Sequence, residues 1–236
     1  METDRYICKN HGLFKRLILS HNIRAPIAKI ISLIDLLKDE CVNHDDNAQI
    51  LIKYLTDSAM SLDEVINDLT NILSVSRAEN QNIELVNLPD IINSVQDSLE
   101  VQIRESGTSL QIYIDENAMY FNSIKSYVNS IIFNLVSNAI KYSKRDIHPS
   151  IIIKAKKYDD RLLLVITDYG IGIDLNKAGT DLFGLYKRFN FSKEGRGLGL
   201  YMTKTQVESL GGTIDVSSHL GVGTTFTISL QLKHNN

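Results

Sequence analysis

Three polar residues in the segment NLVSNAIKYS could together bind a divalent cation and phosphate. Asn134, Asn138 and Lys141 are spaced four and three residues apart, which places them on one face of a helix. Asparagine oxygens suit hard cations, Mg²⁺ usually takes only one or two protein ligands, and a lysine supplies a point charge to the same phosphates. The opposite face is apolar, with Ile131 and Leu135. We therefore expect the polar face to line a cleft, with an ordinary solvated face as the alternative.

Glycines gather in the last third of the chain. DYGIGID follows an apolar segment, EGRGLGL opens a helical pattern, and GVGTTF lies in a hairpin pattern. Glycine lets a backbone approach phosphate closely, and a helix N-terminus adds free N–H groups, so Gly195, Gly197 and Gly199 are suited to bind polyphosphate. Each glycine pair alone is more typical of a simple turn. Because neither GxxxxGK[ST] nor a strand–GxGxxG–helix unit is present, the sequence predicts a different phosphate-binding architecture.

Asp168 ends the strongly apolar segment RLLLVITD and is expected to be partly buried. A buried carboxylate needs hydrogen-bond donors, and an adenine amino group would supply one. The alternative is that Asp168 caps the turn that follows it.

The segment SHNIRAPIAKI carries His21 and, five residues later, Pro26 inside a helical pattern. Proline in a helix interior costs ~3 kcal/mol or more and has no N–H for the carbonyl one turn earlier, here that of Asn22. The pattern predicts a hinge directly after His21, which lies one residue from a seam position at Ser20 and should face outward.

The first third of the chain predicts two helices with heptad seams. The seam positions of the two helices are Ile23, Ile27, Ile30, Ile34 and Leu37, then Leu51, Leu55, Ser58, Leu62, Val65, Leu69 and Ile72. A polar turn, CVNHDDNAQ, separates them. A lone hairpin buries little apolar surface, so we expect a homodimer in which two hairpins form a four-helix bundle.

After residue 80 the pattern alternates between strands and helices, so we expect residues 1–80 and 81–236 to form separate domains. IELVNL, SLQIYID, SIIIKAKKY, RLLLVITD, GTIDVSS and TTFTISLQL predict strands. Residues 88–106, 124–143 and 199–211 predict helices, the first with Pro89 near its start. This order predicts an α+β domain, with a mostly antiparallel sheet and helices on one face.

Composition narrows the class of protein. The 236 residues are 43% hydrophobic and 22% charged, as in ordinary soluble globular proteins. A net charge of −3 argues against a nucleic-acid partner. No apolar run approaches the ~20 residues that a membrane span needs, and the polar start METDRYICKNHG does not resemble a signal peptide. We expect a cytoplasmic chain in which Cys8 and Cys41 are reduced, from a parent protein that is either anchored in a membrane or free of one.

Six motifs, in their order along the chain, resemble the catalytic core of the sensor histidine kinases of two-component systems. SHNIRAPIAKI resembles the phosphoacceptor box, and NLVSNAIKYS resembles the asparagine box. DYGIGID, LFGLYKRF, EGRGLGL and GVGTTF resemble the glycine and phenylalanine boxes of the ATP-binding domain. The resemblance covers essentially the whole chain and implies a gyrase-like ATP-binding sandwich.

The resemblance also implies roles for individual residues. His21 would accept the γ-phosphoryl group of ATP and pass it to an aspartate of a response-regulator receiver domain. Asn138 would hold Mg²⁺, and Asp168 would bind the adenine amine, with Thr224 supporting it through water. The other implied nucleotide contacts are Asn134, Lys141, Tyr142, Gly170, Gly172, Lys187, Arg188, Gly195, Gly197, Leu198 and Gly199. Residues 175–194 would form a lid over the nucleotide.

Three positions depart from the family pattern. Asn22 follows the histidine where an acidic residue is usual, and an amide can accept a hydrogen bond but cannot take a proton. Ala25 replaces a polar residue that positions water for dephosphorylating the regulator, and Tyr169 replaces an asparagine. Asn22 predicts slower autophosphorylation, and Ala25 predicts weak or absent phosphatase activity. Tyr169 leaves the usual polar role at that position unassigned.

Two other functions remain open. The chain could be an ATP-binding dimeric scaffold or phosphotransfer adapter without autokinase activity, which Asn22 allows. It could also be another ATPase of the superfamily, such as an anti-sigma serine kinase or a gyrase-like enzyme. A histidine kinase fits the motifs best, with its signal coming from a separate or upstream sensor module.

Overall fold

The computed structural model of the chain describes residues 29–30, 32–33, 36, 50–59, 62, 82–144, 148–185 and 197–232. The chain divides into two units, Met1–Ser76 and Arg77–Asn236. In the described residues no helix is long and apolar enough to cross a membrane.

The described residues of the first unit are helical. Within 50–62, the seam positions Leu51, Leu55, Ser58 and Leu62 are buried or half-buried, whereas the other described residues are exposed. One side of this helix is therefore less exposed than the rest, as a heptad seam requires. The hairpin turn lies outside the described residues.

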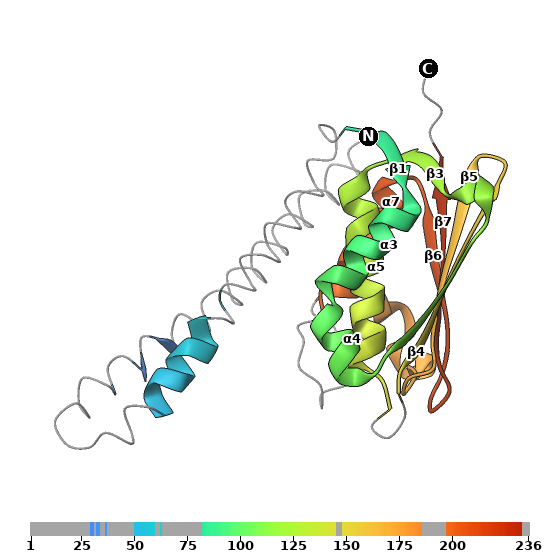
Figure 1. The fold of residues 1–236 in the computed structure, drawn as a ribbon. Helices are drawn as coiled ribbons and strands as arrows, with labels where there is room; N and C mark the ends of the chain where they lie inside the picture. Colours follow the sequence, from blue (N-terminus) through green and yellow to red (C-terminus); the bar gives the residue numbers. More distant parts are fainter. Residues whose placement is uncertain are drawn as a thin grey trace, which may run out of the picture. The chain divides into compact units, whose positions relative to one another are not determined.

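The second unit contains a five-stranded sheet (Figure 1) in the order β2-β4-β5-β7-β6. The strands are β2 (Ser109–Ile114), β4 (Ser150–Tyr158), β5 (Arg161–Asp168), β6 (Thr213–His219) and β7 (Gly223–Gln231). Only β2 and β4 pair in parallel, and the other neighbours are antiparallel. This confirms the predicted, mostly antiparallel sheet.

Helices cover one face of this sheet (Figure 1). They are α3 (Leu88–Ser98), α4 (Glu100–Ser106), α5 (Lys125–Lys141) and α7 (Gly199–Ser209), with the short α6 (Leu175–Ala178), η2 (Glu116–Ala118) and η3 (Gly179–Phe183) in connections. Asn87 caps α3 by accepting from the Asp90 N–H, and a proline stands in the first turn, as is typical of helix starts.

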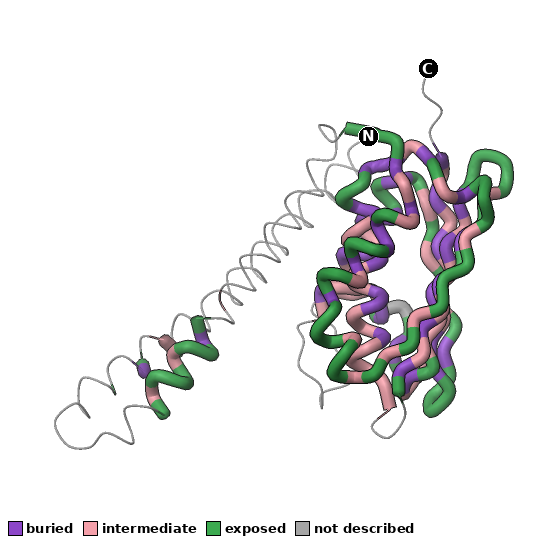
Figure 2. The backbone as a smooth tube through the Cα atoms, viewed as in Figure 1, coloured by how far each residue is buried: buried purple, intermediate pink, exposed green. Residues whose placement is uncertain are grey.

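The core lies between the sheet and the helices, where buried positions gather (Figure 2). On β5, the side chains of Leu162, Leu164 and Ile166 are each at most 2% exposed. Alternate residues of a strand point to the same face, so Asp168 continues this series toward the helix layer at the end of the strand. The strand pattern thus explains why a carboxylate lies beside the core.

Two features differ from the sequence prediction. The helix expected over 88–106 is broken at Leu99, whose backbone leaves helical geometry (φ −109°, ψ 13°). The Ser98 hydroxyl donates to the Ser94 carbonyl just before the break, a bond that bends helices. In addition, β1 (Glu84–Asn87) pairs with an unpredicted strand, β3 (Tyr120–Ser123), as a separate two-stranded ribbon.

Candidate nucleotide site

The carboxylate of Asp168 is held by two main-chain donors. Its Oδ1 accepts from the Gly170 N–H at 2.9 Å and from the Thr224 N–H at 3.3 Å. Thr224 lies opposite Asp168 in the β5–β7 register. One oxygen of Asp168 therefore caps the following turn, which was the alternative reading of this residue, and also ties that turn to β7.

The second oxygen of Asp168 is available to a ligand. Within the described part of the chain, Oδ2 makes no hydrogen bond. Burial raises the pKa of the Asp168 carboxyl, and the hydrogen bonds from Gly170 and Thr224 and the charge of Lys144 only partly offset this effect. A desolvated acceptor with one free oxygen is suited to receive an N–H donor such as an amino group.

The loop after β5 passes so close to other backbone that it requires glycine. A Cβ on Gly170 would lie 2.5 Å from the Tyr142 carbonyl oxygen. A Cβ on Gly172, whose φ is +70°, would lie 2.0 Å from the His219 carbonyl oxygen. Hydrogen bonds join the same segments, from Ile171 N–H to the Tyr142 carbonyl at 3.0 Å and from Gly221 N–H to the Ile171 carbonyl at 2.8 Å. The loop thus joins the end of α5 to the β6–β7 hairpin.

A buried serine adds a further link beside Asp168. The Ser218 hydroxyl accepts from the Ile173 N–H at 2.8 Å, donates to the Gly223 carbonyl at 2.9 Å and lies 2.9 Å from the Thr224 hydroxyl. The Thr224 hydroxyl therefore pairs with Ser218, whereas the direct bond to Asp168 comes from the Thr224 main chain. Neither Ser218 nor this direct bond was predicted from the sequence.

The two asparagines of α5 face the start of α7. A Cβ built on Gly199, the first residue of α7, would lie 3.7 Å from Asn138 Nδ2 and 3.8 Å from Asn134 Oδ1. Both asparagines are half-buried. Among the described residues no side chain caps the N-terminus of α7. Its N–H groups and positive dipole end therefore lie beside amide side chains. This arrangement suits an anion accompanied by a hard cation.

Lys141 and Tyr142 connect the two halves of the site. Lys141 ends α5, and its Nζ lies 5.3 Å from the centroid of the Tyr142 ring. Tyr142 in turn supplies the carbonyl that the loop after β5 approaches. The last turn of α5 is thus shared by the Asp168 end and the α7 end.

The other predicted site residues fall into two groups. Gly197, with φ +72°, and the buried Leu198 directly precede α7. His21, Asn22, Lys187, Arg188 and Gly195 lie outside the described residues.

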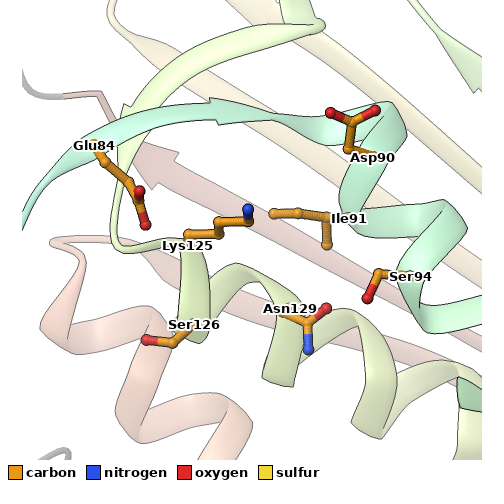
Figure 3. A pocket seen from close by; sticks show the side chains of 7 residues that line it. All are labelled: Glu84, Asp90, Ile91, Ser94, Lys125, Ser126 and Asn129. Carbon is orange, nitrogen blue, oxygen red and sulfur yellow. The ribbon is translucent and has the colours of Figure 1, made fainter.

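A separate hollow of about 400 Å³ lies between β1, α3 and the first turns of α5 (Figure 3). Its lining includes Glu84, Asp90, Lys125 and Asn129. None of the predicted nucleotide residues lines it, because those on α5 lie in the second half of the helix.

Comparison with known proteins agrees with this fold. Residues 125–234 match the family described as "Histidine kinase-, DNA gyrase B-, and HSP90-like ATPase". Over these residues the chain is therefore similar to the gyrase-like ATPase domains, and its mixed sheet covered by helices on one face is consistent with that fold.

Relatives narrow the class. The histidine protein kinase SaeS of Staphylococcus aureus is 28% identical over 215 residues, which is 90% of this chain and 61% of the relative. The chain therefore spans about three fifths of the length of that relative. Together with the family match over residues 125–234, this similarity supports a sensor histidine kinase catalytic core.

Solved structures have the same fold. The histidine kinase ThkA in complex with the response regulator TrrA has a TM-score of 0.74 and 19% identity, covering 97% of this chain and 64% of that one. Full-length ShkA in complex with AMPPNP has a TM-score of 0.64 and 19% identity, covering 93% and 46%.

Proposed function

We propose that this chain transfers the γ-phosphoryl group of ATP to His21 and then to an aspartate of a response-regulator receiver domain. The observation that carries the proposal is the pairing of a held carboxylate, Asp168, with two amide side chains, Asn134 and Asn138, at the open N-terminus of α7. One end is suited to an amino-bearing base and the other to phosphate. The complexes named for ShkA with AMPPNP and for ThkA with a response regulator support both halves of the proposal.

In this proposal Asp168 binds the base. Its Oδ2 accepts a hydrogen bond from the adenine amino group, while the N–H groups of Gly170 and Thr224 keep the carboxylate oriented through Oδ1. A guanine presents an oxygen at the equivalent position, which would leave two acceptors facing each other. The site should therefore select ATP over GTP.

The phosphate end fits a magnesium ion through its donor set. Asn138, with Asn134 beside it, offers neutral amide oxygens next to a helix N-terminus, and Mg²⁺ commonly takes few protein ligands where phosphates complete the shell. Bound Mg²⁺ would neutralise charge on the phosphate oxygens. The N–H groups at the start of α7 and the ammonium of Lys141 would orient the same phosphates.

The chemical step needs a neutral histidine. An imidazole nitrogen of His21 would form a bond to the γ-phosphorus while the bond to the β–γ bridging oxygen breaks, and ADP leaves with the electron pair. The remaining ring proton is lost to water, because Asn22 can accept a hydrogen bond but not a proton. In the second step a receiver carboxylate oxygen bonds to phosphorus while the P–N bond breaks. Its electron pair stays on the imidazole, which regains a proton from water. A histidine of ordinary pKa, ~6.5, is mostly neutral at pH 7.

The first unit would supply the dimer and the phosphoacceptor. Its seam residues are the less exposed ones in the described helix, which supports pairing of two hairpins into a four-helix bundle. Ala25 offers no polar group to orient water, so we expect the chain to accelerate loss of phosphate from its regulator weakly or not at all. Comparing that loss with and without the chain tests the expectation, and a strong acceleration would contradict it.

The test of the main proposal is incubation of the purified chain with γ-labelled ATP and Mg²⁺. We expect acid-labile, base-stable label on the wild type, none on His21→Gln, and wild-type labelling of His44→Gln, a matched control in the same unit. ATP binding, measured by calorimetry, should survive in His21→Gln. Binding without label on the wild type would favour the ATP-binding scaffold, and absence of both would refute the proposal.

A further inference from the structure

A buried polar pair crosses the interface between α5 and α7. The Gln206 side chain of α7 is 4% exposed and donates from Nε2 to the Ser130 hydroxyl of α5 at 3.0 Å. The neighbouring residues, Ile131 on α5 and Val207 on α7, are fully buried and apolar. An amide in such surroundings is not what packing alone would favour.

The amide is only half satisfied. Among the described residues, the buried Gln206 Oε1 has no hydrogen-bond partner, nor has the buried Tyr127 hydroxyl on the preceding turn of α5. An unpaired buried acceptor opposes folding, and a well-packed apolar side chain would avoid that cost. The Gln206–Ser130 pair is therefore better explained by a role in aligning α7 with α5 than by a gain in stability. A buried polar link can fix the register of two packed helices.

The pair lies where register matters most. Gly199 at the start of α7 is opposite Asn134 and Asn138, and Gln206 is opposite Ser130. From Gly199 to Gln206 the chain of α7 advances by seven residues, whereas the facing positions on α5 go back from Asn138 and Asn134 to Ser130. The two helices therefore run antiparallel. Sliding one helix along the other would break the Gln206–Ser130 bond and also shift the α7 N-terminus relative to both asparagines.

We propose that Gln206, anchored on Ser130, is a positioning residue that sets the register of α7 against α5 and so places the phosphate-binding helix N-terminus opposite Asn134 and Asn138. This inference rests on the proposed function and deepens it. It assigns control of phosphate affinity, as distinct from base affinity, to a pair of residues that touch neither part of the nucleotide.

The experiment compares Gln206→Met and Ser130→Ala with the wild type in the full chain. Ser209→Ala is the matched control, because it removes a hydroxyl that donates only within α7, to the Thr205 carbonyl. Dissociation constants are measured by calorimetry for adenosine and for ADP with Mg²⁺, and melting temperatures are measured without nucleotide.

We expect both variants to lose roughly tenfold in ADP affinity, as small misplacements do, with adenosine affinity unchanged and the melting temperature of Gln206→Met unchanged or raised. The double variant should be no weaker than either single one, because both remove the same link. Equal losses for adenosine and ADP, or an unchanged ADP affinity in either variant, would overturn the inference.

A separate readout distinguishes this inference from the proposed function. In nucleotide-free protein, the backbone amide resonance of Gly199 and the side-chain amide resonances of Asn134 and Asn138 should move in both variants and stay in place in Ser209→Ala. If the wild type bound neither adenosine nor ADP, the proposed function would fail, and these resonances would still test the register. Resonances that do not move would overturn it.

Discussion

The two ends of the proposed nucleotide site are fixed in different ways. At the base end, Asp168 receives two main-chain N–H bonds from separate segments, and backbone atoms approach one another too closely for any Cβ. At the phosphate end, a Cβ added to Gly199 would meet the Asn134 and Asn138 side chains only at ordinary van der Waals distance. The base end is thus fixed by backbone, whereas the phosphate end depends on how two helices pack. Substitutions that add a side chain to the crowded backbone of the base end should disturb the fold, whereas substitutions of the amide side chains at the phosphate end should disturb ligand binding alone.

The largest effect is expected at Gly172. Gly172 and Gly221 both have positive φ, +70° and +74°, but a Cβ meets the His219 carbonyl only at Gly172 and meets nothing within 4 Å at Gly221. Alanine should cost about 1 kcal/mol at Gly221 from strain alone and about 3 kcal/mol or more at Gly172. Urea denaturation of the two variants measures the difference. Equal losses of unfolding free energy in the two variants would show that the backbone of the base end adjusts to an added Cβ. The contrast between the two ends would then not hold.

Asp168→Asn should separate binding from folding at the base end. The Asn oxygen can still accept from Gly170 and Thr224, but its amino group would face the adenine amino group. We expect adenosine affinity to fall by about 100-fold, as for loss of a hydrogen bond to a charged group, with no loss of stability. Calorimetry and thermal melting measure the two quantities. Adenosine affinity within twofold of the wild type would exclude Asp168 as the base-binding residue.

Much of the base end could be predicted because it follows from strand alternation. Leu162, Leu164 and Ile166 mark the buried face of β5, and Asp168 continues that face at the strand end. The Thr224 donor could not be predicted in this way, since it is a main-chain group brought opposite Asp168 by a strand 56 residues away. Ser218 was missed because the sequence offers Ser217 and Ser218 side by side. Only the register of β6 decides which of them is buried.

The phosphate end shows the same limit for helices. The spacing of Asn134, Asn138 and Lys141 predicted a shared face, because helical periodicity is local. The facing residues of α7 could not be read from the sequence. Gln206 is one polar residue in a helix with several, and its burial depends on contact with α5. Strand β1 was predicted, but its partner β3 was missed because it has only four residues, and the β1–β3 pairing was missed with it.

Asn138→Ala should affect the phosphate end alone. We expect affinity for ADP with Mg²⁺ to fall by roughly tenfold, because the variant loses one polar interaction with a charged group, the proposed contact of the amide oxygen with Mg²⁺. Adenosine affinity and the melting temperature should stay near those of the wild type. Asn129→Ala is the matched control, because Asn129 lies on the same helix but lines the separate hollow of Figure 3. An equal loss of adenosine affinity would mean that the two ends are not independent.

The smallest effect is a pH dependence confined to the base end. Because burial raises the pKa of Asp168 above the ordinary 3.8, the folded protein holds this proton more tightly than the unfolded chain. That contribution to stability is fully present below pH 3.8 and is lost as pH rises through the folded-state pKa. Asp168→Asn lacks this loss, so its stability advantage over wild type should be largest at pH 7 and should narrow as pH falls through the folded-state pKa toward 3.8.

Adenosine affinity of the wild type should fall over the same range, because the Asp168 carboxylate becomes protonated and no longer accepts as strongly. Urea denaturation at stepped pH measures the first trend, and calorimetry measures the second. A stability difference between the variant and the wild type that stays constant with pH would mean that burial does not raise the pKa of Asp168 in the folded protein.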